Sequence, residues 1–200
     1  MQNVVVVGDS AVGKTILFDR LVNDAPPAAE VRTIGAGFAQ LLTGPGAARP
    51  SLRLWDTEAD PRAACLFFPK EAVAGAIVVF DVCQRTSFDA IPTWIDLVLR
   101  STSLGSHGGL TPARRRPMIA LVGSVLDPAV FHVHGTAQRT VTDAEARQCA
   151  RDLGCHSYHE CSLQSKAELE EILALLMAGD RVQGAVKLPA APCATTKPTR

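Results

Sequence analysis

Residues 8–15 read Gly-Asp-Ser-Ala-Val-Gly-Lys-Thr, a spacing of residue types that suits the binding of a phosphate group. Gly8 and Gly13 let the backbone wrap closely with its N–H groups turned inward, and Lys14 adds a mobile positive charge near the β and γ phosphates. Thr15 opens a helix, so its hydroxyl can bind a magnesium ion while the helix N-terminus contributes partial positive charge. The pattern predicts a nucleotide-binding loop rather than a Gly-rich turn that binds nothing.

This phosphate loop (residues 8–15) follows the apolar run at residues 4–7 and precedes a helical stretch, as expected in a P-loop protein. Apolar runs alternate with helical patterns along the chain, which is typical of a parallel sheet covered by helices on both faces. We therefore expect an α/β fold of the P-loop NTPase kind with a six-stranded, mostly parallel sheet. One edge strand is expected to be antiparallel, because residues 43–50 form a turn-rich connection. The expected strands are 3–7, 37–43, 51–56, 75–81, 117–123 and 156–160, and the expected helices are 14–22, 66–73, 91–101, 143–153 and 166–177.

The composition favours one folded domain over residues 1–178. Of 200 residues, 47% are hydrophobic, whereas residues 179–200 are rich in Pro, Ala and Thr and are expected to be disordered. Lys plus Arg and Asp plus Glu number 20 each, which argues against a nucleic-acid partner. The six cysteines form no CxxC pair and no zinc spacing, so we interpret them as small core residues in a reducing compartment. We expect no secretory signal and no membrane-spanning segment.

Two segments, residues 101–117 and 128–142, are expected to be surface insertions. The first ends in Arg114, Arg115 and Arg116, which we interpret as a solvated loop, with a phosphate or partner contact as the alternative. The second carries His132 and His134, which are expected to be loop residues rather than metal ligands.

A carboxylate and a hydroxyl extend the expected site beyond the phosphate loop. Asp56 ends the strand at 51–56, where a P-loop enzyme places the Asp that holds magnesium through water; the alternative is an ordinary turn residue. Thr33 lies in a Gly-punctuated segment, and its hydroxyl could reach magnesium and the γ-phosphate.

The chain resembles the Ras-like small GTPases, and the Rab branch most closely, from about residue 3 to 178. The resemblance rests on the phosphate loop, Thr33-Ile34-Gly35 before Phe38, Trp55-Asp56-Thr57, residues 75–82, Ser87-Phe88 ahead of Trp94, Leu121-Val122-Gly123 and Glu160-Cys161-Ser162. It implies a G domain that binds GTP or GDP with Mg²⁺, which Thr15 and Thr33 hold directly and Asp56 holds through water. It also implies that Lys14, Thr33 and position 60 serve GTP hydrolysis.

The resemblance implies a set of nucleotide contacts from five segments of the chain. These are Gly8, Asp9, Ser10, Ala11, Val12, Gly13, Lys14 and Thr15; Thr33; Asp56 and Ala59; Ser124, Val125 and Asp127; and Ser162, Leu163 and Gln164.

The segment after Asp56 departs from the family's Asp-x-x-Gly-Gln, because it reads Asp-Thr-Glu-Ala-Asp-Pro. Ala59 still offers an N–H to a γ-phosphate, but it resists the positive backbone angles that glycine adopts. Asp60 replaces the glutamine that orients the attacking water, and its side chain is shorter and negatively charged beside a negative phosphate. We therefore expect very slow intrinsic hydrolysis.

The base-binding motifs are also altered. Ser124-Val125-Leu126-Asp127 replaces Asn-Lys-x-Asp, and Ser162-Leu163-Gln164 replaces Ser-Ala-Lys. Asp127 can still accept from two guanine N–H groups, although a turn residue before Pro128 is the alternative. Ser124 cannot reproduce the contacts of an amide, and Val125 lacks the long stem that covers the base. Binding is therefore expected to be weakened by about 10² or more.

The resemblance implies effector or regulator partners that contact Thr33 to Phe38, Trp55 and residues 57–70. Phe38 and Trp55 match two aromatic residues that Rab proteins display to effectors, and Phe67 or Phe68 supplies a third; ordinary sheet packing is the alternative. Cys193 does not form a prenylation signal, so we expect any membrane contact to come through a partner. The expected location is cytoplasmic, with peripheral residence on an endomembrane as an open alternative.

Three functions fit these residues. The first is a Rab-like GTP-binding switch with impaired hydrolysis, for which the resemblance implies a role in vesicle trafficking. The second is a pseudo-GTPase scaffold whose nucleotide is structural or absent. The third is a small P-loop kinase in which Arg114 to Arg116 serve as lid arginines.

Overall fold

The computed structural model describes residues 2–23, 35–41, 52–69, 73–103, 116–126, 138–163 and 166–178. Several expected functional residues lie outside these ranges. They are Thr33, Asp127 and Gln164 of the nucleotide site, the loop residues Arg114, Arg115, His132 and His134, and Cys193 with the rest of the segment 179–200.

The described residues form a six-stranded sheet in the order β2-β3-β1-β4-β5-β6. Only β2 and β3 pair in the antiparallel sense, and the other described pairs are parallel. The expected sheet, with its antiparallel edge strand, is therefore confirmed. The strands are β1 (Gln2–Val7), β2 (Ala36–Leu41), β3 (Leu52–Thr57), β4 (Val73–Asp81), β5 (Met118–Ser124) and β6 (Ser157–Cys161).

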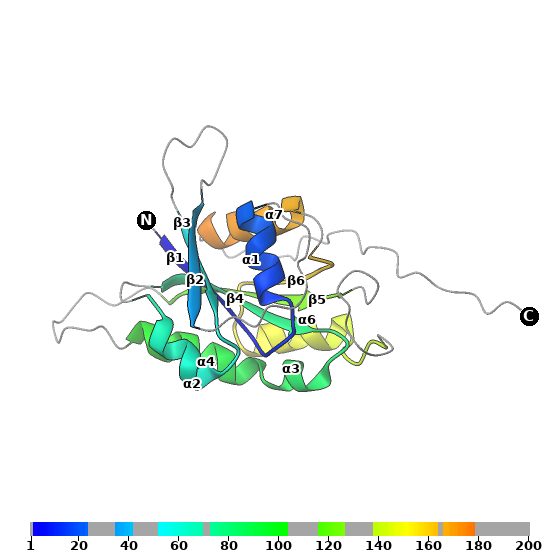
Figure 1. Cartoon of the computed structure of the whole chain (residues 1–200). Coiled ribbons are helices and arrows are strands. Elements are labelled where there is room, and N and C mark those ends of the chain that lie inside the picture. The colour runs from blue at the N-terminus through cyan, green and yellow to red at the C-terminus, as the bar shows by residue number, and fades with distance from the viewer. Residues whose placement is uncertain are drawn as a thin grey trace, which may run out of the picture.

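Helices cover both faces of this sheet, as expected. Figure 1 shows α1 and α7 on one face, and α2, α3, α4 and α6 on the other. Their bounds are α1 (Lys14–Asn23), α2 (Pro61–Ala64), α3 (Arg85–Asp89), α4 (Ile91–Ser103), α6 (Asp143–Asp152) and α7 (Lys166–Ala178), with a 3₁₀ turn η1 at Cys65–Phe67. Among the residues that the structure describes, no helix combines the length and apolar character needed to cross a bilayer.

The sheet separates two hydrophobic cores. Val4 and Val6 of β1 pack with α1 and α7, whereas Val5 and Val7 pack with α3, α4 and α6. Successive side chains of a strand point to opposite faces, so an unbroken valine run fits a strand that is covered on both sides. This burial fixes the carboxyl end of β1, from which the phosphate loop begins.

The prediction of a helix at residues 66–73 is wrong. Instead, α2 begins at Pro61, η1 ends at Phe67, and β4 already starts at Val73. The side chain of Asp60 caps α2 by accepting from the Arg62 N–H, and a proline is well tolerated in the first turn. Phe68 is extended, with φ −65° and ψ 147°, since the residue before Pro69 is disfavoured in the helical region.

The sequence also missed the short helix α3, although the ion pair between Arg85 and Asp89, four residues apart, has helical spacing. The cap expected before α6 is confirmed, because the Thr142 hydroxyl accepts from the Glu145 N–H over 3.2 Å. The interpretation of the cysteines as core residues holds for buried Cys161 and is wrong for exposed Cys65.

Candidate functional site

The phosphate loop turns sharply between β1 and α1, and both of its glycines are required by close contacts. A Cβ at Gly8 would lie 2.2 Å from the Val79 carbonyl oxygen, and Gly8 has φ +147°. A Cβ at Gly13 would lie 2.5 Å from Leu163 Cδ1, and Gly13 has φ +96°. Only glycine fits both positions, so the loop adopts a path that larger residues would prevent.

Lys14 is held at the inner side of this loop. Its side chain is only 7% exposed, and Nζ donates to the Asp9 carbonyl oxygen over 2.6 Å. Burial lowers the Lys14 pKa to about 8, although the negative charges of Asp56 and Asp9 oppose the shift. An ammonium group held in a partly desolvated position is suited to bind a phosphate strongly.

Thr15 and Asp56 form a pair of oxygen groups suited to magnesium. Asp56 lies beside Val6 in the parallel register of β1 and β3, and the Thr15 hydroxyl donates to Asp56 Oδ2 over 2.9 Å. Mg²⁺ takes six oxygen ligands in an octahedron and keeps several of its waters, so a hydroxyl can bind it directly while a neighbouring carboxylate holds it through water. The described residues contain no cluster of three or more His, Cys, Asp or Glu that could hold a metal ion. The Thr15 hydroxyl and the Asp56 carboxylate are oxygen groups of the kind that hold Mg²⁺ together with phosphates and water.

Ala11 carries strain at the outer side of the loop. It is exposed and has φ +61°, a region in which an L-residue with a Cβ is unfavourable. We expect Ala11→Gly to raise the free energy of unfolding by about 0.5–1 kcal/mol, because glycine adopts this angle without the steric cost. Urea denaturation measures the change. Leu163→Gly is the contrasting variant: Leu163 also has a positive φ but is fully buried, so this change should destabilise the protein.

The structure places Ser124 beneath the phosphate loop. Its hydroxyl lies 2.8 Å from the Val12 carbonyl oxygen and 3.1 Å from that of Phe80, and the residue is fully buried. A hydroxyl has one proton to donate, and here both neighbouring acceptors belong to the backbone. Ser124 thus supports the loop from β5 through Val12, and its hydroxyl is directed at protein atoms.

The other described residues of the two base-binding motifs lie next to Ser124. The Val125 N–H donates to the Cys161 carbonyl over 3.0 Å, which joins the two altered motifs. Leu163 is buried in the same core cluster as Val12, and Ser162 before it is half-buried. The structure therefore brings Val125, Ser162 and Leu163 to the carboxyl edge of β5 and β6, beside the loop.

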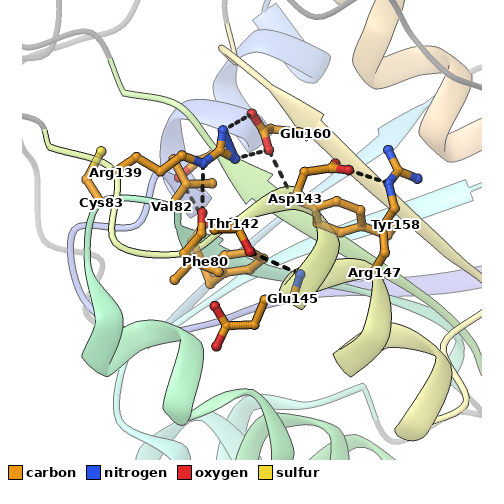
Figure 2. Close-up of polar contacts among 12 residues, drawn as sticks. Phe80, Val82, Cys83, Arg139, Thr142, Asp143, Glu145, Arg147, Tyr158 and Glu160 are labelled. Atoms are coloured by element: carbon orange, nitrogen blue, oxygen red, sulfur yellow. Dashed lines mark hydrogen bonds and ion pairs between the residues drawn. The ribbon is translucent and has the colours of Figure 1, made fainter.

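A polar network beside this edge joins the residues before α6 to β6. Figure 2 shows Arg139 directed at the Glu160 carboxylate, with its two terminal guanidinium nitrogens paired to the carboxylate oxygens. Arg139 also donates to the Val141 carbonyl over 2.7 Å, and Tyr158 donates to Glu160 over 3.1 Å. A bidentate Arg–carboxylate pair fixes both groups in orientation. It ties the chain entering α6 to the end of β6, two residues before Ser162.

The segment after Asp56 is held by bonds among the chain's own atoms. The Glu58 N–H donates to the Gly35 carbonyl over 3.1 Å, and the Gly35 N–H lies 3.3 Å from Glu58 Oε2. The backbone bond continues the β2–β3 ladder by one pair beyond Ala36 and Thr57, and the Glu58 side chain takes the place of the second backbone acceptor. Asp60, exposed at the next turn, accepts from the Arg62 N–H over 2.8 Å. Its carboxylate therefore serves as the cap of α2.

An aromatic surface lies beside the junction that the Gly35–Glu58 bonds form between the segments before β2 and after β3. Phe38 and Trp55 are register partners on β2 and β3, and their rings stack with centroids 4.9 Å apart. Phe38 is 57% exposed and Phe67 is 42% exposed, whereas Phe68 packs against the core. The Phe67 ring lies over Gly35, within 3.6 Å of where a Cβ would stand. Of the two candidates for a third exposed aromatic, Phe67 is thus the one that faces solvent.

Sequence reasoning missed two contacts at the site. Trp94 on α4 donates its indole N–H to Asp9 Oδ1 over 2.7 Å, and Glu58 joins Gly35 as described above. Neither a tryptophan on an amphipathic helix nor an acidic residue at an unspecified position of the motif gives a sequence signal of its partner. Arg116 donates to the Leu153 carbonyl at the end of α6, 3.2 Å away, so this member of the arginine triplet is engaged in structure.

Comparison with known proteins agrees with this geometry. The model of the Ras family matches residues 3–179. Human Ras-related protein Rab-42 is 31% identical over 196 residues, which cover 92% of this chain and 78% of that protein. Ras-related protein Rab-21 of Geodia cydonium is 29% identical over 174 residues, covering 86% of this chain and 68% of that protein. The Ypt/Rab-type GTPase YPT7 of Saccharomyces cerevisiae is 29% identical over 153 residues, covering 76% of this chain and 67% of that protein.

Proposed function

Because the chain belongs to the Ras family, as a divergent Rab-like small GTPase, we propose that it binds GTP or GDP with Mg²⁺ and acts as a switch with poor intrinsic hydrolysis. The observation that carries the proposal is the buried Lys14 ammonium, held inside a loop whose Gly8 and Gly13 backbone N–H groups can surround phosphates. Thr15 and Asp56, together with Thr33 outside the described residues, would hold the magnesium ion. When bound, that ion neutralises charge on the β and γ phosphates.

The base side of the proposed site is expected to be weaker than the phosphate side. Ser124 is directed at Val12 and Phe80, so discrimination between bases would depend on Asp127 and on the backbone at Leu163 and Gln164. We therefore propose guanine-nucleotide binding that is dominated by phosphate and magnesium contacts.

Partners and location follow the same proposal. Phe38, Trp55 and Phe67 would contact an effector or regulator, and the relatives named as Rab proteins support a role in vesicle trafficking. Contact with an endomembrane would come through such a partner.

The nucleotide that copurifies with the protein tests the proposal. The purified full chain is heat-denatured, the released nucleotide is identified by chromatography, and its retention is measured with and without EDTA. Bound GTP or GDP that is released faster by EDTA supports the proposal. Protein that is empty and shows no affinity for guanine nucleotides contradicts it.

Single-turnover hydrolysis is expected to be slow in the wild type and faster in Asp60→Gln. The Asp60 carboxylate is negative and caps α2, whereas glutamine is neutral and long enough to orient a water. We expect the rate constant of phosphate release from preloaded GTP to rise at least about tenfold.

Asp60→Asn is the matched control, because asparagine removes the charge but keeps the short length and caps helices well. A rise in Asp60→Gln alone assigns the defect to side-chain length, and an equal rise in both variants assigns it to charge. If neither variant exceeds the wild type, Asp60 is not what limits hydrolysis.

The second candidate is a scaffold whose partner surface does not change with the nucleotide. Glu58 and Gly35 join the segments before β2 and after β3 through protein atoms alone, and Asp60 fixes α2 in the same way. Contacts that need no γ-phosphate would keep Phe38 and Phe67 in place in either nucleotide state. In an ordinary switch, these segments are ordered by the γ-phosphate instead.

Amide hydrogen exchange separates the two functions. If the Glu58 contacts hold the junction, residues 35–41 and 55–69 should show similar protection with GDP and with a non-hydrolysable GTP analogue. Glu58→Ala should then lower protection with GDP at least about threefold, since a bond to a charged acceptor is lost. Glu170→Ala, which removes an exposed carboxylate from α7, is the control. Protection of the wild type that appears only with the GTP analogue favours the switch and excludes the scaffold.

A further inference from the structure

Trp94 connects the core beneath α4 to the phosphate loop. The residue is 1% exposed and belongs to the same hydrophobic cluster as Phe88 and Ile91. Its indole N–H donates to Asp9 Oδ1 over 2.7 Å, a short distance for a bond to a carboxylate. The large buried ring has few alternative positions in a close-packed interior, so its N–H is a fixed donor. The Asp9 side chain is therefore tied to a rigid part of the protein.

Asp9 is connected to phosphate binding through its backbone as well. Its carbonyl oxygen accepts from Lys14 Nζ over 2.6 Å, and its negative charge acts on the same ammonium group. The position of the Asp9 peptide therefore helps to set the position of the Lys14 charge. A restraint on the Asp9 side chain is also a restraint on Lys14.

The orientation of the Asp9 side chain affects phosphate binding because the side chain is negatively charged. The loop that surrounds an anion contains one carboxylate, and a carboxylate free to turn toward the inward N–H groups would compete with phosphate for them and repel it. The bond to Trp94 holds this charge on the α4 side of the loop.

We propose that Trp94 is a positioning residue for phosphate binding, because it keeps the Asp9 carboxylate away from the anion and fixes the Asp9 peptide that receives Lys14. This inference rests on the proposed nucleotide-binding function. It assigns to a core residue of α4 a role in the affinity of a loop 85 residues away in the sequence.

The test uses the full chain and a fluorescent analogue of GDP with Mg²⁺. Trp94→Phe keeps an aromatic ring and removes only the indole donor, so the affinity is expected to fall about five- to twentyfold. Adding Asp9→Asn to Trp94→Phe is expected to recover most of this loss, since the released side chain no longer carries a charge. A purely structural role of Trp94 would not give a recovery that depends on the charge of Asp9.

Phe88→Leu is the control for lost packing, because Phe88 lies in the same cluster and no described contact joins it to the loop. It should lower the melting temperature while GDP affinity stays at the wild-type value. Three results would overturn the positioning role: unchanged affinity in Trp94→Phe, a loss of the same size in Phe88→Leu, or no recovery in the double variant. If the wild-type protein binds no GDP, the proposed nucleotide-binding function itself is contradicted. This result is distinct from those that contradict the positioning role of Trp94 alone.

Discussion

Lys14→Met is expected to reduce the affinity for GDP and GTP by at least about 30-fold. Removing one partner of a desolvated, hydrogen-bonded charge pair costs about 2–5 kcal/mol, and Lys14 supplies a buried charge that would pair with the phosphates. Methionine keeps a flexible apolar side chain in the same space, so the free energy of unfolding in EDTA without added nucleotide should not fall. Titration with a fluorescent GDP analogue and urea denaturation measure the two quantities.

The affinity should also depend on pH through Lys14. Burial lowers its pKa to about 8, so above pH 8 the ammonium of the free protein loses its proton, whereas a bound phosphate favours the charged form. Binding must then take up a proton. The affinity should therefore fall with rising pH above 8, with a slope that approaches a tenfold loss per pH unit. Lys166→Met, at the start of α7, is the control and should retain this decline. An affinity that is independent of pH between 7 and 9.5 would contradict the role of Lys14.

The free energy of unfolding is expected to fall by roughly 3 kcal/mol between pH 6.5 and pH 4 because of His159. His159 is 5% exposed on β6, and its Nε2 has no hydrogen-bond partner among the described residues. Burial, with a contribution from the nearby Arg147 charge, lowers its pKa from 6.5 to about 4. The unfolded chain therefore takes up a proton near pH 6.5 that the folded protein resists until about pH 4. Stability is fully present above pH 6.5, declines as the pH falls, and becomes level below pH 4.

Urea denaturation at several pH values, in EDTA without added nucleotide, measures this dependence. His159→Leu should flatten it between pH 6.5 and 4, because leucine has no proton to gain. Tyr158→Phe, on the same strand, should keep the dependence, since burial raises the pKa of Tyr158 and it does not titrate there. Asp81, whose pKa burial raises, acts in the opposite sense. A dependence in His159→Leu as steep as in the wild type would exclude His159 as the cause.

The elements of the fold were predictable wherever burial decided them. The valines of β1 and the apolar runs of β4 and β5 are covered on both faces, so hydrophobic residues follow one another without a break and indicate the strands directly. The prediction of a helix at 66–73 was wrong, because the Asp60 side chain caps a helix that begins at Pro61 and because Phe68 is extended. These effects moved the helical turn toward the N-terminus.

The site was predictable where its chemistry is made by consecutive residues. Gly8, Gly13, Lys14 and Thr15 belong to one short loop and the start of the helix after it, so their spacing alone predicts phosphate binding. Ser124 shows the limit of this approach. Its type indicated that it cannot act as an amide toward a base, but only the register of β5 with β4 showed its hydroxyl beneath Val12.

The sequence by itself determined that the chain has a P-loop, where the strands lie and which residues depart from the family's motifs, because each of these depends on neighbours along the chain. Only the tertiary structure decided that Trp94 holds Asp9, that Glu58 closes the junction with Gly35, and that His159 is buried as a neutral group. Each of these results joins residues or environments far apart in sequence. Such pairs are brought together by strand order and by the packing of helices on the two faces, which no local pattern specifies.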